Sequence, residues 1–101
     1  MRLHGNVRKR LTEVGGELAR LRDALAVIDE QVAFQRGVAD DLDVRATVAE
    51  TPLADRERRE AAGDLGRLER QRAETAGRIA TLVAEQDALL ERLVPAAQHD
   101  G

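Results

Sequence analysis

Apolar residues along this chain recur at alternating steps of four and three, and the pattern reverses at one point, Thr51-Pro52. Before that point the repeat consists of Val7, Leu11, Val14, Leu18, Leu21, Leu25, Ile28, Val32, Ala39, Leu42, Ala46 and Ala49. After it the repeat consists of Ala54, Ala61, Leu65, Leu68, Ile79, Leu82, Leu89 and Leu93. Heptad spacing is typical of a helix that presents one narrow seam to another helix. The pattern therefore predicts an all-α fold, a long antiparallel coiled-coil hairpin that associates into a helical bundle.

The turn of this hairpin is expected near Glu50-Pro52. A threonine can cap the free backbone N–H groups of a new helix, and proline fits the first helical position, where no N–H partner is lost. We therefore predict one helix over about residues 7–47 and a second over about residues 52–94. The ends, residues 1–6 and residues 95–101, are predicted to be a frayed start and a loose tail.

The two halves of the repeat also predict which residues face each other. In an antiparallel coiled coil each a position faces a d position on the partner helix. Pairing Leu18 with Leu82 makes the two residue numbers in every layer add to 100, which places the turn near position 50, as the Thr-Pro signal does. The seam is interrupted by four polar residues, Gln35, Arg72, Thr75 and Gln86. Such residues commonly fix the register of a coiled coil, and that is the role we predict for them.

Composition supports a thin, elongated core in a single domain. Of the 101 residues, 43% are hydrophobic, but Phe34 is the only aromatic one, and 35% are charged. A net charge of −3 gives no general attraction to nucleic acid or membrane, so neither partner is predicted. The chain has no cysteine and no apolar stretch long enough to span a membrane, and a cytoplasmic location is expected.

No set of residues predicts catalysis. Serine and cysteine are absent, and the two histidines, His4 and His99, lie in the expected loose ends. The glycines of the second helix are spread out and form no phosphate-binding loop. We therefore predict that the protein is not an enzyme and has no cofactor and no metal site.

Some apolar residues lie outside the seam and predict contact with another protein. The ones that a two-helix seam leaves exposed, alanines aside, are Val27, Phe34, Val38, Val83, Leu90 and Val94. Contiguous exposed apolar surface usually marks a contact site. These residues predict a protein-interaction or adaptor module that forms a homodimer or small homo-oligomer, or docks on a larger complex. A plain structural spacer remains an alternative.

Acidic residues near the turn allow a second interpretation. Asp40, Asp41 and Asp43 precede the turn, and such carboxylates can assist a metal ion that is bound elsewhere. The neighbouring arginines can also neutralise them locally, and these are Arg45, Arg56, Arg58 and Arg59. Local neutralisation predicts a solvated turn without a specific site.

A long helical finger with an acidic end resembles the coiled coil of the Gre-type transcript cleavage factors. That family carries its acids in a Gly-Asp-Leu segment, and the chain has Gly63-Asp64-Leu65 within the second helix and Asp41-Leu42-Asp43 near the turn, without the glycine. The resemblance implies an accessory factor of RNA polymerase that lends tip carboxylates to the catalytic magnesium. This is the alternative function, with Asp40, Asp41 and Asp43 as its site.

Overall fold

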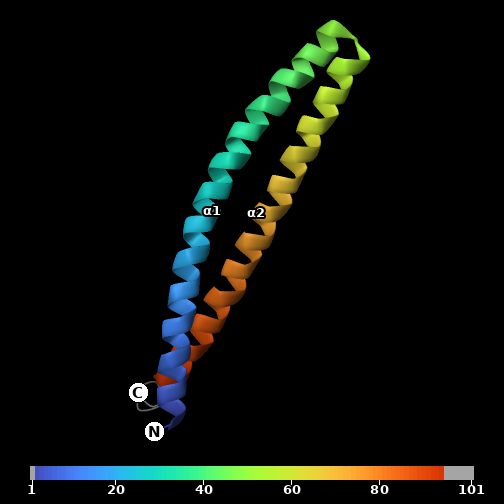
Figure 1. The fold of residues 1–101 in the computed structure, drawn as a ribbon. Coiled ribbons are helices and arrows are strands. Elements are labelled where there is room, and N and C mark those ends of the chain that lie inside the picture. Colours follow the sequence, from blue (N-terminus) through green and yellow to red (C-terminus); the bar gives the residue numbers. More distant parts are fainter. Residues whose placement is uncertain (1, 95–101) are drawn as a thin grey trace. The chain divides into compact units, whose positions relative to one another are not determined.

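The protein is all-α and consists of two long helices in a hairpin (Figure 1). The structure is a computed structural model, and it describes the backbone of residues 2–94 and the side chains of residues 4–94. Helix α1 spans Arg2–Ala49 and helix α2 spans Pro52–Leu93. The predicted all-α helical hairpin and the predicted position of the turn are confirmed. The expected loose tail, including His99, lies outside the described residues.

Helix α1 begins earlier than the sequence pattern suggests. The predicted start was about Val7, with a frayed segment before it, but the helix begins at Arg2 and includes His4 and Gly5. Val7 is only 3% exposed, and its burial fixes the turn of helix next to this segment. Once a turn is fixed, each further residue adds a backbone hydrogen bond at little entropic cost, so the helix extends past the last buried position.

The turn is built from local backbone chemistry at Glu50 and Thr51. Glu50 has a φ of 53°, and its N–H donates to the carbonyl of Ala46 over 3.1 Å. This left-handed residue and its hydrogen bond form a common helix C-cap. The hydroxyl of Thr51 then accepts a hydrogen bond from the N–H of Ala54, also over 3.1 Å. Threonine therefore caps α2, as predicted, and Pro52 occupies its first position.

The contacts of the hairpin divide it into two units, and each contains a segment of both helices. The terminal unit comprises residues 1–23 and 76–101, and the loop unit comprises residues 24–75. The core of the terminal unit contains the buried side chains of Val7, Val14, Leu18, Leu82 and Leu89, with Leu11, Leu21, Ile79, Val83 and Leu93 packed against them. In the predicted layer Leu18–Leu82 both side chains are buried in this core, and in the predicted layer Leu11–Leu89 the partly buried Leu11 packs against it.

The loop unit has a thinner core, and polar contacts also join its two helices. Its buried hydrophobic residues are Ile28, Val32 and Ala61. The side-chain N–H of Gln35 donates to the carbonyl of Ala61 over 3.2 Å. Arg72, another polar residue of the seam, pairs with Asp29 of α1. Two of the four polar seam residues thus bind specific partners on the opposite helix, which is what a role in fixing the register requires.

Candidate interaction surfaces

Most of the exposed large apolar side chains of the described residues lie in the loop unit. Phe34 is 74% exposed and Val27 is 54% exposed, and both were predicted to lie outside the seam. Val38, from the same predicted set, is half-buried. Three more residues of the loop unit are also exposed, namely Val44 at 63%, Val48 at 79% and Leu53 at 60%. Exposure of this extent leaves these side chains with few apolar neighbours from their own chain.

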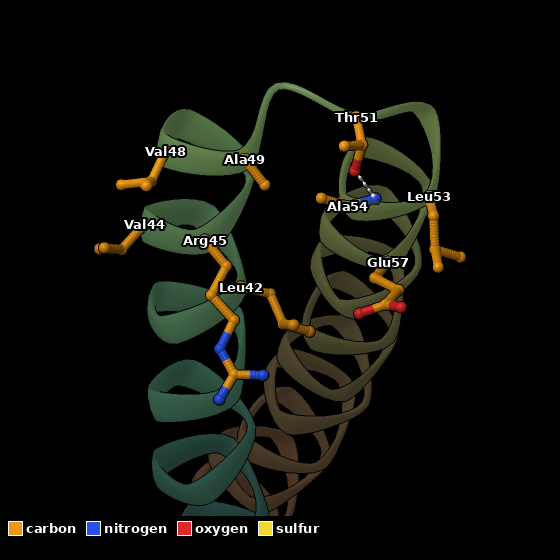
Figure 2. Close-up of a pocket in the computed structure, with 9 residues that line it drawn as sticks. All are labelled: Leu42, Val44, Arg45, Val48, Ala49, Thr51, Leu53, Ala54 and Glu57. Carbon is orange, nitrogen blue, oxygen red and sulfur yellow. Dashed lines mark hydrogen bonds between the residues drawn. The ribbon is translucent and has the colours of Figure 1, made fainter.

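The exposed residues near the turn border an open hollow of about 450 Å³ (Figure 2). Its lining consists of Leu42, Val44, Arg45, Val48, Ala49, Thr51, Leu53, Ala54 and Glu57. In Figure 2 the side chain of Leu42 points toward α2, whereas Val44 and Val48 point away from it. The helix ends therefore carry apolar side chains on their outer surface as well as between them.

The loop unit contains two further hollows, the second of which shares lining residues with the first and with the hollow at the turn. The first, of about 350 Å³, is lined by Glu30, Gln31, Phe34, Gln35 and Leu68. The second, of about 340 Å³, is lined by Phe34, Gln35, Val38, Leu42, Glu57, Glu60, Ala61 and Asp64. Phe34 and Gln35 line both of them, and Leu42 and Glu57 are shared with the hollow at the turn. We call the three together the loop groove, which follows α1 and α2 from Phe34 to the turn.

The charged residues that line the loop groove are mostly acidic. Four acids, Glu30, Glu57, Glu60 and Asp64, face a single base, Arg45. Asp64 pairs with Arg67 of its own helix. Glu57 and Glu60 form no ion pair within residues 4–94. The groove therefore combines an apolar lining from both helices with an acidic edge on α2, formed by Glu57, Glu60 and Asp64.

The acids proposed for the alternative function do not form a site with one another. Asp40, Asp41 and Asp43 are all exposed on α1. In the part of the chain that the structure describes, no three His, Cys, Asp or Glu side chains converge as they would around a metal ion. Asp64, of the Gly-Asp-Leu segment, lies within α2 and away from the chain reversal at residues 50–51.

Two of the four arginines near the turn, Arg58 and Arg59, pair with Asp55. Its carboxylate lies 2.7 Å from Arg58 and 3.4 Å from Arg59, which follow it by three and four residues on α2. The hydrogen bond from Arg58, together with the charges of both arginines, lowers the pKa of Asp55. Asp55 also lies in the first turn of α2, where the helix dipole favours a negative charge.

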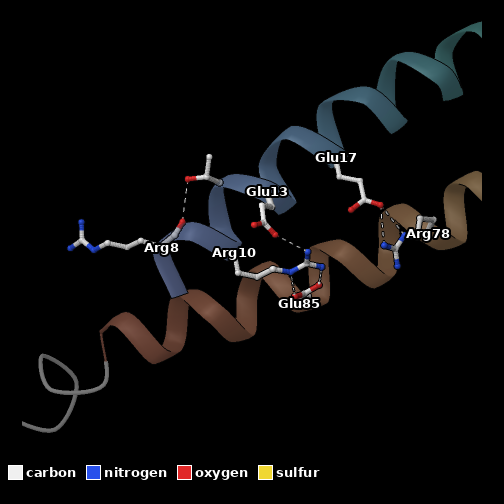
Figure 3. Close-up of polar contacts among 7 residues, drawn as sticks. Arg8, Arg10, Glu13, Glu17, Arg78 and Glu85 are labelled. Carbon is white, nitrogen blue, oxygen red and sulfur yellow. Dashed lines mark hydrogen bonds and ion pairs between the residues drawn. The ribbon is translucent and has the colours of Figure 1, made fainter. Parts of the chain in front are cut away.

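The described part of the terminal unit exposes fewer large apolar side chains than the loop unit. Two ion pairs, Arg10–Glu85 and Arg78–Glu17, join its helices (Figure 3). Arg10 donates two hydrogen bonds to Glu85, of 2.6 and 2.8 Å, and Arg78 donates to Glu17 over 2.9 Å. The hydrogen bonds from Arg10 lower the pKa of Glu85. Of the candidates on this unit, Leu90 and Val94 are exposed at 47% and 46%. The third, Val83, packs against the core, which leaves less of it available to a partner.

Sequence reasoning missed the apolar residues beside the turn. Val44, Val48 and Leu53 are not among the residues predicted from the sequence to contact a partner. None of the three fits the heptad seam, so each is an apolar residue on a solvent-facing helical position. The signal was therefore present in the sequence, since the same criterion had selected Val27 and Phe34.

Comparison of the chain with protein-family models, with curated proteins and with solved structures found no match. Neither helix, over the residues that the structure describes, is long and apolar enough to cross a membrane.

Proposed function

We propose that this protein is a non-catalytic interaction module that self-associates or docks on a larger protein complex through the loop unit. The observation that carries the proposal is the exposure of Val27, Phe34, Val44, Val48 and Leu53 in a unit that buries few apolar residues of its own. Apolar surface in contact with water is unfavourable by about 25 cal/mol per Å² relative to buried surface. Covering several such side chains with a partner therefore supplies a substantial driving force for association.

The polar contacts of the hairpin support the same function. Gln35 and Arg72 each bind a partner on the opposite helix, so the alignment of the two helices is specified before any partner arrives. A preorganised surface loses less conformational entropy on binding than a disordered one. The loop unit is thus suited to present its apolar side chains in a fixed pattern.

The proposal is tested by sedimentation equilibrium across a concentration series, with circular dichroism on the same samples. Phe34→Glu places a charge in the exposed apolar surface. Ala26→Glu is the matched control, because Ala26 is exposed on α1 of the same unit but lines none of the hollows. We expect association of the wild-type chain to be weakened at least tenfold by Phe34→Glu and little by Ala26→Glu, with helicity kept in both.

A wild-type chain that stays monomeric calls for capture of partners by immobilised chain, with the same two variants. The proposal then expects a captured protein that Phe34→Glu loses and Ala26→Glu retains. Association or capture that both variants leave unchanged contradicts it.

A further inference from the structure

The loop groove has a chemistry that selects one kind of occupant. We infer that it receives an amphipathic α-helix whose apolar face packs on Phe34, Val38 and Leu42 and whose flanking side chains are basic. This inference rests on the proposed function and names the partner class. It follows from the shape, the backbone and the charge of the groove.

The groove has the length and walls that a helix requires. Phe34, Val38 and Leu42 are spaced four residues apart on α1, so they form one stripe along it. From Phe34 to Ala49, both of which line the groove, α1 rises about 22 Å at 1.5 Å per residue. A partner helix of about 15 residues covers that length. Apolar anchors at every third or fourth position on such a helix would meet the stripe.

The backbone of the groove argues against an extended peptide. Strand-like ligands gain affinity by hydrogen bonding to an exposed sheet edge. Here both walls are α-helices, Arg2–Ala49 and Pro52–Leu93, whose interior N–H and C=O groups bond to their own helix. An extended segment laid in the groove would lose water without finding backbone partners, which is costly. A helix satisfies its own backbone and avoids that penalty.

Charge indicates which helix fits. The acidic edge of the groove contains Glu57 and Glu60, which form no ion pair within residues 4–94, whereas Arg45 is the only base among its lining residues. Arginine or lysine on the partner would complement these carboxylates and raise the rate of encounter. The same charge disfavours a symmetric dimer in which two grooves face each other, since that arrangement brings the two acidic edges together.

Binding of labelled peptides to the full chain, followed by fluorescence anisotropy, tests the inference. The basic probe is a 16-residue helical peptide with leucines at helical spacing and arginines and lysines on the flanks. The acidic probe has the same leucines and glutamates in place of the bases. We expect the basic probe to bind at least tenfold more tightly than the acidic one, with a difference that shrinks as salt is added.

Variants separate the roles of charge and apolar surface. Glu57→Lys combined with Glu60→Lys should weaken the basic probe at least tenfold and strengthen the acidic one, whereas Asp87→Lys, in the terminal unit, should have little effect. Phe34→Ala should weaken both probes. Equal binding of the two probes, or no response to the double charge reversal, overturns the inference.

The same set of variants distinguishes failure of this inference from failure of the proposed function. If the wild-type chain binds neither probe but forms a dimer that Phe34→Glu dissociates, a second copy covers the surface. That result would contradict a basic helix as the occupant and would support the proposed function. If Phe34→Glu changes neither self-association, partner capture nor probe binding, both fall.

Discussion

The terminal unit and the loop unit contain segments of the same two helices, yet they use their apolar residues differently. The terminal unit buries Val7, Val14, Leu18, Leu82 and Leu89 in one core. The loop unit buries Ile28, Val32 and Ala61 and exposes Val27, Phe34, Val44, Val48 and Leu53. A shared heptad pattern therefore does not give shared packing. In the loop unit the seam is interrupted by Gln35, Arg72 and small alanines, so fewer of its residues are buried.

Removing one buried leucine should affect stability far more than removing an exposed one. Leu82 is fully buried in the terminal unit, so Leu82→Ala should lower the free energy of unfolding by about 3 kcal/mol. Leu53→Ala, at a position that is 60% exposed in the loop unit, should change it by less than about 0.5 kcal/mol. Urea denaturation followed by circular dichroism measures both. Similar costs for the two variants would remove the contrast between the units.

Replacing the polar seam residue Gln35 should stabilise the loop unit but make the register between its two helices less well defined. The carbonyl of Ala61, which accepts the hydrogen bond from Gln35, is also a backbone acceptor inside α2, so removing the side-chain donor does not leave it unpaired. Gln35→Leu should therefore raise the free energy of unfolding by about 1 kcal/mol through added apolar burial.

The register role of Gln35 has its own readout. Paramagnetic labels placed on the two helices of the loop unit should give one distance in the wild type and a broader distribution in Gln35→Leu. A destabilised variant with an unchanged distribution would mean that Gln35 contributes stability and not register.

A substitution at Glu50, the left-handed residue of the turn, should have a smaller effect and should stabilise the chain. Glu50 adopts a φ of 53°, which glycine reaches without the steric cost that a side chain brings. Glu50→Gly should raise the free energy of unfolding by about 0.5–1 kcal/mol. Glu57→Gly, inside α2, is the control and should lower it by about 1 kcal/mol. Thermal unfolding measures both signs, and a destabilising Glu50→Gly would show that the turn is not as described.

The ion pairs of the terminal unit predict a response to acid. The hydrogen bonds from Arg10 lower the pKa of Glu85 in the folded chain. The stabilisation that the Arg10–Glu85 pair contributes is therefore complete above the pKa of an unfolded glutamate. It is lost as the pH falls through the pKa of the folded state. Stability should therefore decline below about pH 4, where unfolded glutamate takes up its proton.

The contribution of Glu85 to that decline is isolated by substitution. Glu85→Gln should make the decline shallower. Glu74 is exposed and forms no ion pair within residues 4–94, so Glu74→Gln should leave the decline unchanged. Identical pH profiles for the wild type and Glu85→Gln would contradict the role of the pair. The effect should be small, because both side chains are partly exposed and water screens them.

Much of this arrangement follows from the sequence because helices and turns depend on local chemistry. Heptad spacing predicted both helices, and the capping preference of Thr51 with the fixed φ of Pro52 predicted where the second one begins. The exposure of Phe34 was also predictable, since a position outside the seam has no partner helix to cover it.

Other features depend on non-local geometry and could not be predicted. The half-burial of Val83 arises from packing against the core of the terminal unit, which heptad position alone does not determine. The continuity of the loop groove depends on how Leu42 and Glu57, from different helices, line the same hollows. Helix α1 extends to Arg2 because propagation continues past the apolar repeat, which the repeat itself does not reveal.

Amide hydrogen exchange of the free chain tests most directly whether the loop unit is stabilised by fewer buried apolar residues than the terminal unit and leaves apolar surface free for a partner. The account predicts faster exchange for residues 24–75 than for the described helices of the terminal unit, because local opening is easier where few apolar residues are buried. Uniform exchange along both helices, or slower exchange in the loop unit, would contradict it.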